Sequence, residues 1–187
     1  DIIWVKNYFE EVGGIYMRHG SAGTPVIVGD QFWIPTSHGQ GEVMNRHHKI
    51  FDLKLEVGDP EEVPPPKPDL IVLDKNTGEW IAKDDITLPE VFHGQWASIS
   101  AAEVDGRWLV FWGDGYGILR AFELPEKKEG EIVTLNQVWQ YDGNPPEHRY
   151  DEKGEPISFP YAPWKPDIYG RAKDIGPNYH IGAPVYW

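Results

Sequence analysis

The chain contains no cysteine among its 187 residues. This absence excludes disulfide bonds, thiolate nucleophiles, cysteine-ligated zinc, iron–sulfur clusters and covalent c-type haem attachment through this chain. No apolar run approaches the roughly 18 uninterrupted residues of a transmembrane helix, so we expect no membrane insertion. A signal peptide and an opening methionine are also lacking. We therefore expect the chain to start downstream of any such signal.

Basic residues are scarce, with 17 Lys and Arg against 30 Asp and Glu, for a formal net charge of −13. A surface of this sign repels phosphate backbones and anionic lipids. We expect no nucleic-acid partner, and we interpret the acidity as an aid to solubility.

No segment predicts a helix of any length, whereas aromatic residues are abundant: nine Trp, nine Tyr and seven Phe, interrupted by 20 Gly and 17 Pro. This composition is typical of an all-β protein. Two Pro-rich segments, 38–68 and 143–180, are interpreted as long insertions between strands. We expect strands over Ile2–Val5, Pro25–Val28, Gln31–Thr36, Leu70–Leu73, Glu79–Lys83, Ala97–Val104, Trp108–Trp112, Ile118–Glu123 and Val138–Tyr141.

A phrase of small and β-branched residues ending in a Gly–Asp or Asp–Gly turn occurs at Gly23–Asp30 and again at Ala97–Gly106. A third copy starts at Ile181–Trp187 and breaks off. Repeat folds bury their apolar faces against neighbouring units, so this pattern predicts a piece of a larger repeat protein. We expect about two four-stranded antiparallel units, with edge strands of two more. A β-sandwich is the structural alternative.

Between two of the expected strands lies the turn Asp74-Lys75-Asn76-Thr77-Gly78. Asp74 can accept backbone N–H groups from residues 76–78, and Gly78 can supply a left-handed conformation. Thr77 can add a hydroxyl hydrogen bond. We interpret Asp74, Thr77 and Gly78 as structural turn residues rather than as catalytic ones.

These phrases together resemble the blade of the pyrroloquinoline-quinone-like (PQQ-like) β-propeller repeat family. Gly23–Trp33 is similar to the first half of the blade pattern, Leu70–Gly78 to the second half, and Gly115–Phe122 to the strand before the turn in the next blade. The resemblance implies that residues 1–187 are a fragment of one partial β-propeller domain with degenerate blades. It also implies that Trp4 and Trp139 dock neighbouring blades.

The blade between Trp4 and Trp139 departs from the family pattern. Ala82 stands at the position of the docking tryptophan, and Trp80 comes two residues before that position. The resemblance implies a non-catalytic scaffold in an extracytoplasmic protein, periplasmic or secreted. Its partners would be other blades of the same propeller or other protein subunits, and no cofactor is predicted.

Two alternatives stay open. A PQQ-dependent quinoprotein dehydrogenase would need a closed ring around the quinone, a calcium ion and an aspartate base, as known for the family. A carbohydrate-binding module would use exposed tryptophans, for which Trp96 and Trp164 are the candidates. Trp33, Trp108 and Trp112 are expected in core or inter-blade packing.

Histidines supply the remaining candidate chemistry. His38, His47 and His48 share one insertion, but adjacent residues on an extended chain point in opposite directions, so we predict no metal site there. His93 precedes a strand and is expected to form a polar cluster with Asp114 and His38. His93 and Asp114 are the catalytic candidates, and we expect their cluster to close a contact between blades rather than to catalyse.

Overall fold

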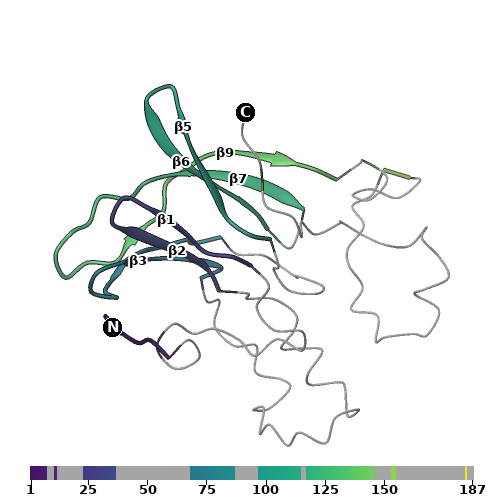
Figure 1. Cartoon of the computed structure of the whole chain (residues 1–187). Coiled ribbons are helices and arrows are strands. Elements are labelled where there is room, and N and C mark those ends of the chain that lie inside the picture. The colour runs from purple at the N-terminus through teal and green to yellow at the C-terminus, as the bar shows by residue number, and fades with distance from the viewer. Residues whose placement is uncertain are drawn as a thin grey trace, which may run out of the picture.

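The computed structural model describes residues 1–7, 11, 23–36, 68–86, 97–114, 117–144, 146, 153–154 and 184. The expected insertions at 38–68 and 143–180, and the expected strand from Ile181, lie almost wholly outside the described residues. Within the described part, the chain forms two β-sheets joined by turns and extended segments (Figure 1). The prediction of an all-β fold is confirmed.

The first sheet contains five strands in the order β1-β2-β3-β4-β8. Neighbouring strands are antiparallel except that β8 runs parallel to β4. Its strands are β1 (Val26–Val28), β2 (Gln31–Pro35), β3 (Leu70–Asp74), β4 (Trp80–Lys83) and β8 (Val133–Thr134). The two expected hairpins of this region are present, and β8 is a strand that the sequence did not predict.

The second sheet contains four antiparallel strands in the order β5-β6-β7-β9. These are β5 (Ser100–Val104), β6 (Arg107–Gly113), β7 (Ile118–Glu123) and β9 (Gln137–Asp142). The expected strand over Ile2–Val5 belongs to neither sheet, and this prediction is wrong. The side chain of Trp4 anchors the N-terminal segment to the first sheet.

The main core lies between the two sheets. Trp33 and Trp112 are completely buried there, and the ring centroid of Trp33 lies 6.4 Å from that of Phe122. Burial of these large aromatic side chains is the strongest term holding the sheets together. Trp108, in contrast, is 47 % exposed, so it is not part of this core, and its packing against another blade stays a prediction. It lies beside the β5–β6 turn, which projects past the first sheet (Figure 1).

Each sheet also carries apolar side chains on the face that points away from the other sheet. On the first sheet Ile71 and Leu73 are buried there, with Phe32, Ile34, Trp80 and Trp4 packed around them. On the second sheet Leu109, Phe111 and Ala121 are buried, with Ala102 and Val104 beside them. An antiparallel sheet with one solvated face alternates apolar and polar residues. Both sheets here are apolar on both faces.

The two sheets repeat the same register. One row of paired residues crosses each sheet, and a β-bulge follows at the same place in both, between Val72 and Leu73 and between Ala121 and Phe122. The rows are Val26–Trp33–Val72–Ala82 in the first sheet and Ser100–Phe111–Ala121–Trp139 in the second.

These equivalent rows point in the same direction. Trp33, Val72 and Ala82 face the second sheet, whereas Phe111 and Ala121 face away from the first. The sheets are therefore stacked head to tail, and the same face of each points the same way. They do not present equivalent faces to each other.

Candidate functional site

Buried polar side chains gather at the end of the sheets where β1, β3, β5 and β7 begin, which we call the loop end. The starts of β1 and β5 meet there, where Ile99 N–H donates to the Thr24 carbonyl at 3.1 Å. Connections longer than a tight turn leave this end, and loops on a rigid scaffold are where function concentrates. The buried polar residues at the loop end are Thr36, Asp69, Asp84, Asp114 and Arg120.

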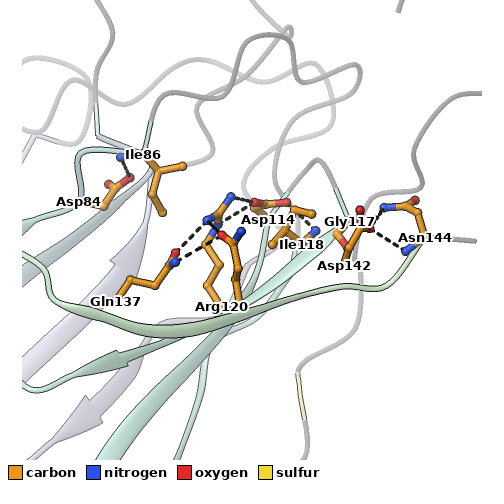
Figure 2. A network of polar contacts seen from close by, with 10 residues as sticks. Asp84, Ile86, Asp114, Gly117, Ile118, Arg120, Gln137, Asp142 and Asn144 are labelled. Atoms are coloured by element: carbon orange, nitrogen blue, oxygen red, sulfur yellow. Dashed lines mark hydrogen bonds and ion pairs between the residues drawn. The ribbon is translucent and has the colours of Figure 1, made fainter. Parts of the chain in front are cut away.

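Asp114 forms a buried ion pair with Arg120 (Figure 2). Its Oδ2 accepts from Arg120 Nε at 2.8 Å and lies 2.8 Å from Nη2, while its Oδ1 accepts Ile118 N–H at 2.9 Å. Arg120 Nη1 donates to the Gln137 and Gln140 side-chain oxygens, each at 2.8 Å. Both charges are thus paired and hydrogen-bonded, as a buried ion pair requires. Asp114 is therefore committed to holding β6, β7 and β9 together.

Asp84 is a buried carboxyl that the sequence analysis did not single out (Figure 2). Its Oδ1 accepts Leu70 N–H at 2.7 Å, and its Oδ2 accepts Ile86 N–H at 3.1 Å. Burial raises the pKa of Asp84 to about 6, against the lowering effect of these backbone hydrogen bonds. A carboxyl group that titrates near neutrality at a loop end is a recognised mark of a functional site, although structural groups share it.

Asp84 and Asp114 close their strand pairs in the same way. Asp84 N–H donates to the Leu70 carbonyl while its carboxylate accepts the Leu70 N–H. Asp114 makes the same reciprocal ring with Ile118. Each ring fixes the first residue of a strand, β3 or β7. The geometry thus supports a structural role for both carboxylates.

The opposite end of the first sheet holds the turn that the sequence singled out. Asp74 Oδ1 accepts N–H groups of Asn76 at 2.8 Å and Thr77 at 3.2 Å. Gly78 has a φ of 74°, in the left-handed region, and its N–H donates to the Asp74 carbonyl. Thr77 Oγ1 accepts Glu79 N–H at 3.2 Å. Every polar group described in this turn serves the turn itself or the contacts around it.

Trp4 packs directly on this turn. Its indole Nε1–H donates to the Lys75 carbonyl at 2.7 Å, and its ring lies over Gly78. A Cβ on Gly78 would stand only 2.9 Å from Trp4 Cδ2, so this position requires glycine for space as well as for its φ. The turn is therefore a receptor for a tryptophan that comes from outside the sheet.

Lys127 links the second sheet's β7–β9 connection to the first sheet. Its ammonium group lies 2.8 Å from Asp74 Oδ2 and 3.0 Å from Glu79 Oε2. Lys127 is the main cause that lowers the pKa of Asp74, followed by the Asn76 N–H. The same two carboxylates raise the pKa of Lys127.

Trp139 stands on the outward face of the second sheet. Its ring centroid is 5.9 Å from that of Phe111, and 39 % of the residue is exposed. Tyr141, two residues further along the same strand, is 67 % exposed. Unlike Trp4, Trp139 packs on a residue of its own sheet among the described residues.

The other sequence candidates lie outside the described residues: His38, His47, His48, His93, Trp96 and Trp164. Among the described residues Asp114 forms an ion pair with Arg120, and the expected cluster with His93 and His38 stays a prediction. Within the described ranges, no group of three or more His, Asp or Glu side chains could hold a metal ion. The described part also contains no helix that is long and apolar enough to cross a membrane.

A scan against protein-family models, a search of curated proteins and a search of solved structures each return no match for this chain.

Proposed function

We propose that this chain is a non-catalytic scaffold, a segment of a PQQ-like β-propeller in a larger extracytoplasmic protein or assembly. Its task is to offer rigid sheet faces to other blades of the same propeller or to other protein subunits. The observation that carries this proposal is the head-to-tail stacking of two sheets with the same register.

Head-to-tail contacts repeat, because the surface used on one unit remains free on the next. The face that the first sheet turns toward the second has its counterpart in the outward face around Phe111 and Ala121. On that outward face Trp139 and Tyr141 are 39 % and 67 % exposed, and exposed apolar side chains that lie together on a protein mark a contact site. The register shared by the two sheets favours a further β-sheet as the structure that covers this outward face.

The N-terminal segment supports the same arrangement from the other side. Trp4 joins the apolar cluster of Ile71 and Leu73 on the outward face of the first sheet. Its seat on the Asp74–Gly78 turn is what a docking tryptophan from a preceding blade would need.

The contacts of the two buried carboxylates favour a scaffold over the quinoprotein dehydrogenase. A catalytic base needs an oxygen within reach of a substrate proton. The oxygens of Asp114 are engaged by Arg120 and Ile118, and those of Asp84 by backbone N–H groups.

An experimental structure of the protein in its native assembly tests the proposal. We expect another four-stranded sheet to lie about 10 Å from the outward face of the second sheet. Ala102→Glu, which places a charge on that face, should break the contact, whereas Glu103→Gln on the exposed side of the same strand should leave it intact. A face that meets only solvent would refute the proposal, and a quinone absorbance spectrum of the native protein would favour the dehydrogenase.

A further inference from the structure

A groove of about 670 Å³ runs between the start of β4 and the β7–β9 connection. This volume falls within the range of small-molecule sites, about 300–1,000 Å³. All of its lining lies within the described residues: Glu79, Trp80, Lys127, Lys128, Glu129, Gly130, Glu131 and Ile132. We call it the Trp80 groove.

Both walls of the Trp80 groove are held in place. On one wall, Trp80 pairs with Leu73 in the sheet and packs in the Ile71–Leu73 cluster, which fixes its indole while the residue stays partly exposed. On the other wall, Lys128 and Glu131 form an antiparallel bridge around Gly130, whose φ is 69°. Pre-organised walls reduce the conformational entropy that the protein loses when a ligand binds.

The polar lining offers both donors and acceptors. Lys127 is occupied by Asp74 and Glu79, and Lys128 lies 3.8 Å from Glu131. Glu129 has no hydrogen-bond or ion-pair partner among the described residues, and it is exposed. Carboxylates accept hydrogen bonds and ammonium groups donate them, so the groove can satisfy hydroxyl groups, which do both.

The apolar lining stands beside these charges. Trp80 supplies an aromatic surface, and Ile132, which is 48 % exposed, supplies an aliphatic one. A strongly charged ligand of either sign would meet like charges in this groove, because both carboxylates and ammonium groups line it. A neutral ligand with an apolar face and a hydroxylated rim meets no like charge there.

We propose that the Trp80 groove binds a neutral saccharide, with a sugar ring against Trp80 and hydroxyl groups on Glu129, Glu131 and Lys128. None of the groove residues lies on the outward face of the second sheet, where the further sheet is expected, whereas Trp80 belongs to the outward face of the first sheet. The scaffold would then present a glycan-binding edge on the side of its blades.

Binding is measured on the full chain by titration calorimetry, with cellohexaose, maltohexaose and N-acetylchitohexaose as probes. We expect at least one of the three to bind, and Trp80→Ala to weaken it by about tenfold or more, as loss of an aromatic contact predicts. Trp108→Ala removes an exposed tryptophan from another surface and should change nothing. Circular dichroism verifies that each variant is folded.

A second variant protects the test from a folding defect. Glu129→Gln with Glu131→Gln changes exposed side chains only and should weaken binding several-fold. Because the ligand is neutral, raising the salt concentration to about 0.5 M should leave the affinity nearly unchanged. A decalysine peptide is titrated in parallel.

Failure of all three saccharides to bind would overturn the proposal, as would equal losses in Trp80→Ala and Trp108→Ala. Binding of decalysine that needs Trp80 and disappears in salt would also overturn it and would reassign the groove to a basic peptide. None of these results bears on whether a third sheet covers the second sheet. The saccharide proposal can therefore be refuted while the scaffold proposal stands, and the reverse.

Discussion

Asp84 should make the stability of this protein fall as the pH rises from about 4 to 7. Burial raises its pKa from the ordinary 3.8 to about 6. Between these values the folded state binds more protons than the unfolded state, so the stabilising effect is fully present below pH 4 and is lost as the pH rises through 6. Two pKa units at about 1.4 kcal/mol each amount to about 3 kcal/mol.

Asp84→Asn removes the titrating group while keeping the oxygen that accepts Leu70 N–H. The free energy of unfolding is measured for parent and variant by urea denaturation, followed by tryptophan fluorescence, in steps between pH 4 and 7. The difference between them should shift by about 3 kcal/mol in favour of the variant over this range. Subtracting the parent cancels the contributions of other carboxylates.

Asp85→Asn is the matched control, because Asp85 is the next residue and is exposed. The change with pH in the difference between Asp84→Asn and the parent should exceed the change for this control. A difference between Asp84→Asn and the parent that stays constant from pH 4 to 7 would show that burial does not raise the pKa of Asp84, and it would refute this prediction.

Three further substitutions test the contacts that join the elements, each by urea denaturation. Arg120→Met leaves Asp114 buried without its partner and should cost about 3–5 kcal/mol, with Arg120→Lys recovering only part of the loss; a loss below about 1 kcal/mol would contradict the buried pair. Gly78→Ala should destabilise by more than about 1 kcal/mol, because alanine must take a left-handed φ against the Trp4 ring, whereas Gly29→Ala, at a φ of 60° with open space around it, should cost less. Lys127→Met removes a part-buried ion pair with Asp74 and an exposed one with Glu79, and should cause a small loss of stability that high salt reduces.

Most strands could be predicted because each is a short apolar run that ends at a Gly–Asp pair or a similar turn. The hairpin across Gly29 and Asp30 is an example, since a left-handed glycine fixes where the strands reverse. Strand β8 could not be predicted, because two residues carry no periodic signal and their partner β4 lies about 50 positions earlier. The exposure of Trp108 could not be predicted, because alternation gives the face of a strand but not the point where the opposing sheet ends.

The candidate site was only partly accessible from the sequence. The Asp74 turn depends on neighbours within five residues, so its residues could be named in advance. Asp84 and Arg120 are buried, and their partners Leu70 and Gln140 stand 14 and 20 positions away, so no local motif signals their burial. Asp114 was noticed, but its partner Arg120 was not, because an arginine in a strand usually faces water.

The direction of the two sheets is the strongest argument for further units. If the sheets formed a self-contained sandwich, equivalent rows would face inward on both, and the outer rows would be polar. Instead, Trp33 faces inward while its counterpart Phe111 faces outward, and both are buried. A shift of one residue in either register would reverse this pattern, so it is a specified feature of the sequence. A third sheet beyond Phe111 could pack on the second sheet through the same kind of contact that the second sheet makes with the first.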